Sequence, residues 1–309
     1  MRNAAVLALV VWAASAQAGL LGPGQTLRRI PFTLADGDKP MLAATVGDHS
    51  GRVLLDNGTP YAIFINRDSV ALGAGTPLAQ GRAASGQLIH VQRHDKVAVA
   101  IDGQALAVDD TVLSGNFGFT APAFGADFLG FLGTPALQPD AFALDYPQQQ
   151  LVLIKPQPDG GLGALAPTAT ETLAQWAFSL PPGGQPSFAV QLGTLPLVAE
   201  LDTGDAGTLY ASDATVALLR QQGLLRAAGD RWQLRGLRIA GVRMAPTPVG
   251  LVQAGGPDDH RNNGQPDLLR LGAAFLRAQP LLWNFAAHQL TLLKPGSAYP
   301  KRLRAASAP

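Results

Sequence analysis

The chain contains the same sequence pattern twice, and this repeat constrains the fold more than any other feature of its 309 residues. Compared with itself at an offset of 146 residues, the sequence aligns over about forty residues without a gap. The matched pairs are Phe32 and Phe178, Pro40 and Pro186, Gly47 and Gly193, Asp56 and Asp202, Gly58 and Gly204, and Val70-Ala71-Leu72 and Val216-Ala217-Leu218. Later the offset becomes 139, where QLVLIKP from Gln150 meets QLTLLKP from Gln289. Two similar units are therefore expected.

Each unit has the pattern of short strands joined by turns. An alternating strand leads into an apolar strand that ends at the aspartate, and a second apolar strand and a short helix follow. The helix is clearest in the second copy, where Ser212 can cap its start and Gly223 can end it. Hairpins are expected near residues 86–91 and 231–234. A hydrophobic-Gly turn, a short helix and a QL-x-L strand close each unit. The alternating apolar positions are Leu42, Ala44 and Val46, and then Phe188, Val190 and Leu192.

Composition agrees with a turn-rich, mostly β protein. The chain has 35 Gly and 24 Pro, and only 15% of its residues are charged. Without cysteine it has neither disulfides nor a cysteine-based zinc site. Basic and acidic residues nearly balance, and no long run of like charge or phosphate-binding glycine pattern occurs. We therefore expect no nucleic-acid partner, no cofactor and no metal.

The first 18 residues have the pattern of a secretory signal peptide. Arg2 is followed by an apolar stretch over residues 4–14 that is too short to span a bilayer, and Ala16-Gln17-Ala18 has the small-x-small pattern of a cleavage site. The mature chain is expected to start at Gly19, without a membrane span, and to be secreted or periplasmic. An uncleaved N-terminal anchor is the alternative.

The remaining chain divides into two lobes. We expect an N-terminal lobe over residues 19–156, a linker rich in Gly, Pro, Ala and Thr over 157–172, and a C-terminal lobe over 173–296. Residues 297–309 are basic and lack periodicity, so they are expected to form a frayed tail. The simplest assembly is a monomer whose lobes face each other, and pairing between repeats of two molecules is the alternative.

The repeated aspartates are the best candidates for a functional site. Asp202 ends the apolar run VAELDTG, and Asp56 ends RVLLDNG. A lone Asp-Thr-Gly is a weak signal, since aspartate often begins turns. A carboxylate at the end of a buried strand is nevertheless costly to desolvate, which favours a role that needs it there.

Together these motifs resemble the retropepsin-like and pepsin-like aspartic peptidases, and most closely the bacterial exported proteins of the aspartyl protease family. The resemblance rests on Asp-Thr-Gly at Asp202, on Phe131-Leu132-Gly133, and on the closing segment from Leu144 to Leu153. It covers residues from about 30 to 294. It implies an all-β, bilobed acid-protease fold, with two homologous β-barrel-like lobes and a cleft between them.

The resemblance also implies a chemistry. Asp56 and Asp202 would share one proton, because two carboxylates about 3 Å apart cannot both ionise, and the ionised one would activate a water that attacks a peptide bond. Gly58 and Gly204 would present their backbone amides to the carboxylates, and the hydroxyl of Thr203 would bind the opposite lobe. Thr59 is compatible with the position beside Asp56.

Two positions depart from the family pattern. Asn57 stands where a hydroxyl residue is usual, and its amide is one atom longer. Asp205 stands where a small residue is usual, so its carboxylate should either face solvent or repel the dyad and raise its pKa. These departures leave two hypotheses: an aspartic endopeptidase, or a degenerate member that binds extended peptides by strand pairing.

Other polar clusters give weaker signals. Asp258-Asp259-His260 lies in a polar loop without the spacing of a metal site and is expected to be solvated. His90 and His94 lie beside the first hairpin and are expected at the surface. A pepsin-like enzyme would use a tyrosine near Gly86 to cover its substrate, and the sequence has none there.

Overall fold

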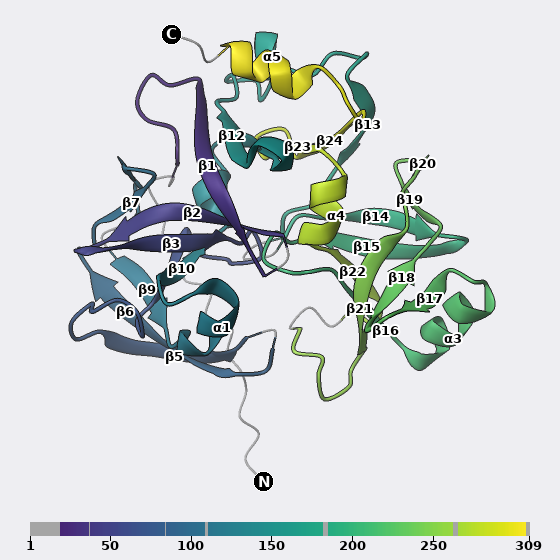
Figure 1. The fold of residues 1–309 in the computed structure, drawn as a ribbon, viewed down its shortest axis with the longest axis horizontal. Coiled ribbons are helices and arrows are strands. Elements are labelled where there is room, and N and C mark those ends of the chain that lie inside the picture. Colours follow the sequence, from purple (N-terminus) through teal and green to yellow (C-terminus); the bar gives the residue numbers. More distant parts are fainter. Residues whose placement is uncertain are drawn as a thin grey trace.

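Two β-rich lobes lie side by side, and a shared sheet, here called the central sheet, lies above both in the view of Figure 1. The computed structural model describes residues 19–36, 38–83, 85–108, 111–181, 185–261 and 265–306. The expected signal peptide at residues 1–18 lies outside these ranges and stays a prediction. Strands dominate the described chain, and the prediction of a mostly β, two-lobed fold is confirmed.

The first half supplies the N-terminal lobe and one side of the central sheet. Its helical elements are the short helices α1 (Ala121–Phe124) and α2 (Thr134–Leu137) and the 3-10 turns η1 (Gly118–Thr120) and η2 (Tyr146–Gln148). Its strands are β1 (Leu27–Ala35), β2 (Lys39–Val46), β3 (His49–Leu55), β4 (Ile63–Asn66), β5 (Thr76–Arg82), β6 (Leu88–Asp95), β7 (Val99–Ile101), β8 (Gln104–Ala105), β9 (Thr111–Gly115), β10 (Phe128–Leu132), β11 (Ala141–Asp145) and β12 (Gln150–Ile154).

The second half repeats the plan with a longer helix. The helical elements are η3 (Gly163–Leu165), α3 (Asp213–Gln221), α4 (Ala273–Ala278) and α5 (Tyr299–Ala306). The strands are β13 (Thr172–Ala177), β14 (Ser187–Leu192), β15 (Leu195–Leu201), β16 (Thr208–Ala211), β17 (Leu225–Ala228), β18 (Arg231–Leu234), β19 (Leu237–Ile239), β20 (Val242–Arg243), β21 (Thr247–Gln253), β22 (Leu268–Leu271), β23 (Leu281–Asn284) and β24 (Gln289–Leu293).

The central sheet joins the two halves and shows their symmetry. Its strand order is β13-β24-β23-β11-β12-β1, in which each strand from one half has a counterpart from the other. The halves meet where β11 pairs with β23, and the rings of Phe142 and Trp283 lie 4.5 Å apart across this junction. Hydrogen bonds and buried aromatic rings therefore fix the lobes to one another. The predicted lobe boundaries stay a prediction, because this sheet takes strands from both halves.

Within each lobe, a parallel strand pair positions the aspartate. β3 runs parallel to β10, and β15 runs parallel to β22. The backbone N–H of Asp56 donates to Leu132 O at 2.9 Å, and that of Asp202 donates to Leu271 O at 3.0 Å. Both aspartates thus follow the carboxyl end of a strand in the middle of a sheet.

The ungapped alignment at offset 146 is wrong beyond the aspartate turn. Phe64, eight residues after Asp56, pairs with Phe131. Thr208, only six residues after Asp202, pairs with Arg270, which stands at the place of Phe131. The second turn is therefore two residues shorter. The identical triplets Val70-Ala71-Leu72 and Val216-Ala217-Leu218 concealed this difference in the sequence alignment.

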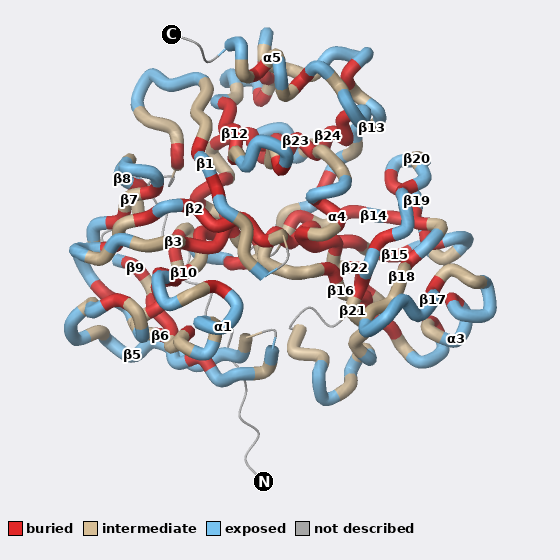
Figure 2. Tube along the Cα trace, viewed as in Figure 1, coloured by how far each residue is buried: buried red, intermediate tan, exposed pale blue. Residues whose placement is uncertain are grey.

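The core confirms the expected alternation along the strands. Leu42, Ala44 and Val46 in β2 are buried, as are their counterparts in β14 (Figure 2). Both predicted hairpins form, as β5–β6 and β17–β18. Ser212 caps α3 by accepting from Thr215 N at 3.2 Å, and Gly223 follows with a φ of +68°, which suits the end of a helix.

The first copy lacks the expected helix after its second apolar strand. Residues 67–70 form a turn and a bend instead, and residues 71–73 have no regular structure. The Asn66 side chain donates to Ser69 Oγ at 2.8 Å and accepts from Asp68 N at 3.2 Å. Such local side-chain hydrogen bonds compete with helix formation, which explains why only the second copy forms this helix.

Of the expected tail, residues 297–306 do not fray, contrary to the expectation. Residues 299–306 form α5, whose Tyr299 and Leu303 are buried against the central sheet. Arg302 pairs with Glu171 at 2.8 Å, so α5 also fixes the end of the linker. Tyr299 and Leu303 are four residues apart and therefore share one face of the helix, a pattern that the basic composition of the segment concealed. None of the described helices is long and apolar enough to cross a membrane.

We predict that Leu303→Ala lowers the free energy of unfolding by about 2–3 kcal/mol, because it leaves a cavity beneath α5. Leu303 is 2% exposed, whereas Lys301 in the same helix is exposed. Chemical denaturation of both alanine variants measures the effect, with Lys301→Ala as the matched control. Equal stability of the two variants would show that α5 does not contribute to the core.

Candidate active site

The loops that follow β3 and β15 bring the two aspartates together. The Asp56 carboxylate oxygens accept from Gly58 N and Thr59 Oγ1, both at 2.9 Å. A Cβ built on Gly58 would lie 3.0 Å from Oδ1 of Asp56 and 2.8 Å from Oδ2 of Asp202, so the two carboxyls converge on one point, and the charge of Asp202 raises the pKa of Asp56. The geometric part of the expectation therefore holds: residues 146 positions apart form one pair.

Asp202 has a similar environment with one replacement. Its Oδ1 accepts from Gly204 N at 2.9 Å, as Asp56 accepts from Gly58. Its Oδ2 accepts from Gln185 Nε2 at 2.8 Å, where Asp56 uses the hydroxyl of Thr59. The residue equivalent to Thr59 is Asp205, which as a carboxylate cannot donate. Gln185, just before β14, thus supplies the missing hydrogen bond.

Two glycines allow this close approach. A Cβ built on Gly204 would lie 2.6 Å from Cγ of Asp56, and one built on Gly58 would lie 2.8 Å from Oδ2 of Asp202. Neither separation is possible for a real side chain. Gly58 and Gly204 are therefore required where each loop passes the carboxyl group of the opposite lobe.

Asn57 and Thr203 exchange four hydrogen bonds across the lobe boundary. Thr203 Oγ1 donates to Leu55 O at 2.6 Å and accepts from Asn57 N at 3.1 Å. In return, Asn57 Nδ2 donates to Leu201 O at 2.6 Å, and Asn57 Oδ1 accepts from Thr203 N at 2.7 Å. In Asn57 the amide nitrogen donates and the amide oxygen accepts, whereas in Thr203 the single hydroxyl oxygen does both. Asn57 therefore fits the role for which its length raised doubt.

The paired carboxyls favour a proton on Asp56. Although part of Asp56 reaches solvent, protein atoms from both lobes surround its carboxyl group. Loss of hydration first, and then the charge of Asp202, raise the pKa of Asp56 to about 8. The bonds from Thr59 and Gly58 oppose the shift only in part.

Asp205 neither turns to solvent nor points freely at the dyad. Its Oδ1 accepts from Gly207 N at 2.6 Å and from Thr208 Oγ1 at 3.0 Å, so it stabilises its own turn. Burial raises the pKa of Asp205, the Asp202 charge adds to this, and Arg270 opposes it. Of the two expected placements, exposure to solvent is wrong, because the turn and Arg270 hold Asp205 beside Asp202, where the two negative charges repel each other.

Arg270 is the site residue that the sequence patterns missed. Its Nε lies 3.5 Å from Oδ2 of Asp202, and its Nη2 donates to Glu200 Oε2 at 3.2 Å. Sequence signals for this pair existed. At the place where the first lobe pairs Leu54 with Phe131, the second pairs Glu200 with Arg270, so two opposite charges interrupt otherwise apolar strands.

The weaker candidates have structural roles. Asp259 is not solvated as expected, because Arg261 pairs with it at 2.6 Å and both side chains are buried. His94 is also buried rather than at the surface, and its Nε2 shares a hydrogen bond with Ser114 Oγ at 2.9 Å. His90 is exposed, as expected. Among the described residues, no group of histidines and carboxylates is arranged to hold a metal ion.

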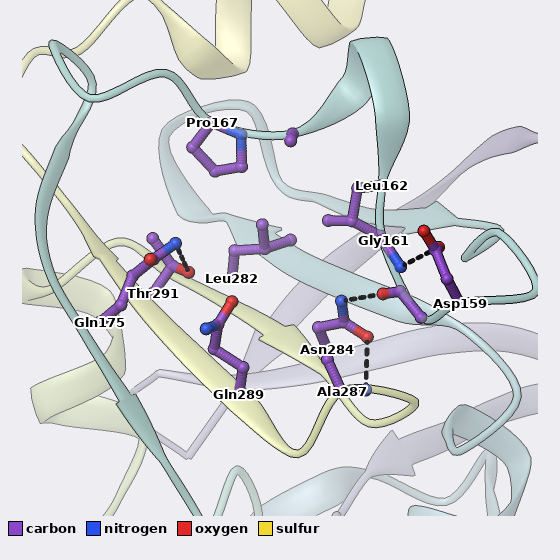
Figure 3. A pocket seen from close by; sticks show the side chains of 12 residues that line it. Asp159, Gly161, Leu162, Pro167, Gln175, Leu282, Asn284, Ala287, Gln289 and Thr291 are labelled. Carbon is purple, nitrogen blue, oxygen red and sulfur yellow. Dashed lines mark hydrogen bonds between the residues drawn. The ribbon is translucent and has the colours of Figure 1, made fainter.

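A cavity of about 320 Å³ lies between the linker and the central sheet (Figure 3). Asn284 Nδ2 donates to Gly160 O at 2.8 Å on its wall, and Leu162 contributes apolar surface. Neither Asp56 nor Asp202 lines it. This cavity belongs to the docking of the linker rather than to the paired aspartates.

Comparison with solved structures identifies the fold. The chain is similar to an aspartic proteinase from Irpex lacteus, with a TM-score of 0.52 and 12% sequence identity, over 88% of this chain and 98% of that one. No protein-family model matches the sequence. No curated protein matches it either. The likeness shows the bilobed fold of pepsin-like aspartic proteinases, and at this identity it shows the fold alone.

We predict that Thr203→Val destabilises the protein by about 2–6 kcal/mol. The variant keeps the side-chain shape but leaves Asn57 N and Leu55 O buried without a partner, at about 1–3 kcal/mol each. Thr111→Val on the exposed face of β9 is the control. Matching unfolding midpoints for the two variants would contradict a structural role for the cross-lobe exchange.

We also predict that Asp56→Asn is more stable than the wild type at neutral pH. Because the folded-state pKa is raised, the stability from the bound proton is complete below about pH 4 and is lost as pH rises towards about 8. The wild type therefore loses at most about 1.4 kcal/mol per pH unit over this range, and the neutral amide loses nothing. Thermal unfolding from pH 4 to 8 measures this, with the exposed Asp95→Asn as control. Parallel curves for Asp56→Asn and wild type would refute it.

Proposed function

We propose that this protein is an aspartic endopeptidase that hydrolyses peptide bonds with the pair Asp56 and Asp202. The observation that supports this most is the convergence of the two carboxyls on one point beside Gly58, together with the raised pKa of Asp56. One protonated and one ionised carboxyl, held at the junction of two lobes, form the acid and base that peptide hydrolysis requires.

The reaction needs only water and the two carboxyl groups. The ionised carboxyl takes a proton from a bound water, and the water oxygen bonds to the scissile carbonyl carbon. The protonated carboxyl gives its proton to the carbonyl oxygen, which yields a neutral tetrahedral diol. The diol then collapses as a hydroxyl proton returns to one carboxylate and the other carboxyl protonates the leaving nitrogen, so the C–N bond breaks. The dyad ends in its starting protonation state.

An extended peptide is the substrate that suits this geometry. The turn of the β5–β6 hairpin approaches the second lobe, since a Cβ on Gly86 would lie 2.8 Å from Nε2 of His260. β5 is the last strand of its sheet and is exposed along its whole length. Such an edge can pair with an extended chain. With the signal-peptide pattern, this suggests a peptidase that acts in the periplasm or outside the cell as a monomer.

One observation favours the alternative, a peptide-binding module without activity. The Gln185 amide donates to Asp202 and would collide with any side chain at Gly58, so it lies directly at the carboxyl pair. If it keeps the attacking water out, the pair cannot work as an acid and base. Peptide hydrolysis and peptide binding must therefore be measured separately.

We predict that the protein beginning at Gly19 cleaves a denatured protein, and that Asp56→Asn and Asp202→Asn each abolish cleavage, since neither carboxyl can act as both acid and base. Activity should be bell-shaped in pH and blocked by a pepstatin-like inhibitor. Asp127→Asn, which removes only a carboxylate paired with Arg52, is the control and should remain active. Cleavage that persists in Asp202→Asn would exclude this mechanism.

A further inference from the structure

The two halves of the aspartate pair have very different surroundings. Beside Asp56, the adjacent parallel strands carry Leu54 opposite Phe131. Beside Asp202, the equivalent positions carry Glu200 opposite Arg270. A symmetric pair of carboxyls is therefore embedded in an asymmetric electrostatic field, with one fixed cation on the Asp202 side.

Arg270 is held in place from four directions. Nη2 donates to Glu200 Oε2 at 3.2 Å and Nη1 donates to the hydroxyl of Tyr210 at 3.3 Å. Nε lies 3.5 Å from Oδ2 of Asp202, and Nη1 lies 3.9 Å from Oδ2 of Asp205. The side chain is only 13% exposed, so solvent screens these charges weakly.

The second lobe also stacks rings and cations around this group. The guanidinium of Arg270 lies 5.4 Å from the centroid of the Tyr210 ring, and the guanidinium of Arg261 lies 4.2 Å from the same centroid. Arg261 is itself paired with Asp259. Arg270 thus belongs to a rigid buried network and is not a mobile surface cation.

The charged groups that face the two carboxyls differ between Asp56 and Asp202. Asp202 faces the carboxyl of Asp56, the cation of Arg270 and, further away, the anions of Asp205 and Glu200. Asp56 contacts only neutral donors, Thr59 and Gly58, apart from Asp202 itself. An opposite charge within about 4–6 Å favours the ionised form of a carboxyl. Among the described residues, Arg270 forms an ion pair with Asp202, and no ion pair involves Asp56.

We propose that Arg270 is a positioning residue that fixes the shared proton on Asp56 and the negative charge on Asp202. The proposal deepens the proposed function, because it assigns the two roles. Asp202 takes the proton from the attacking water, and Asp56 donates to the carbonyl oxygen. The pair then does not exchange roles freely, as two equivalent carboxyls would.

Removing Arg270 should have two measurable effects. The remaining proton should be shared more evenly between the carboxyls, because the main source of asymmetry is gone. Loss of that proton should also occur at a pH higher by about 1–3 units, since a nearby cation no longer favours the doubly ionised pair. Arg270→Lys keeps the charge and should preserve the distribution of the proton.

Carbon-13 NMR of aspartate carboxyl carbons in the free protein tests this without any need for activity. Asp56→Asn and Asp202→Asn assign the two signals. On titration through the neutral and mildly alkaline range, the Asp56 carbon should show most of the change and the Asp202 carbon little. Arg270→Met should spread the change over both carbons, whereas Arg52→Met, which removes an ion pair in the first lobe, should leave it on Asp56.

A double variant covers the case in which Arg270→Met fails to fold. Glu200→Leu with Arg270→Phe recreates the apolar pair of the first lobe and removes both members of the Glu200–Arg270 ion pair together, so that neither is left buried without the other. It should also spread the titration over both carbons. The proposal is overturned if the Asp202 carbon dominates in the wild type, or if the double variant retains the wild-type pattern. An inactive wild type with the expected pattern would reject the proposed function alone.

Discussion

The exchange of hydrogen bonds between Asn57 and Thr203 is the constraint on which the rest of the site depends. Each residue follows an aspartate, so bonding to the opposite loop fixes both carboxyls at once. Both side chains are almost fully buried, so a lost partner could not be replaced by water. The central sheet brings the lobes together, and this exchange sets the final separation of the carboxyl groups.

Around that symmetric core, the second lobe carries polar and charged side chains where the first has Leu54 and Phe131. Asp205 cannot supply the hydroxyl donor that Thr59 supplies in the first lobe, and Gln185 donates to Asp202 instead. Arg270 lies close enough to both carboxylates to compensate their charge. A buried charge that loses its partner is costly, so these three residues are energetically linked even though they come from different segments.

Much of the fold and the pair itself could be predicted from the sequence, because both follow from local pattern and repetition. The repeat identified Asp56 and Asp202, and alternation identified the strands. Arg270 and Gln185 escaped prediction because their roles depend on contacts between distant segments. The helix α5 escaped because two apolar residues in a basic segment, Tyr299 and Leu303, are a weak signal until a surface exists to cover them.

The central claim is that Asp56 and Asp202 act on a tetrahedral intermediate and do not merely hold a peptide. Calorimetry can compare two peptides that differ only in a central hydroxyl group, which mimics that intermediate. A catalytic pair should bind the hydroxyl peptide at least about 100-fold more tightly, and Asp202→Asn should remove this preference. Equal affinity of the wild type for both peptides would contradict the claim and would identify a binding module.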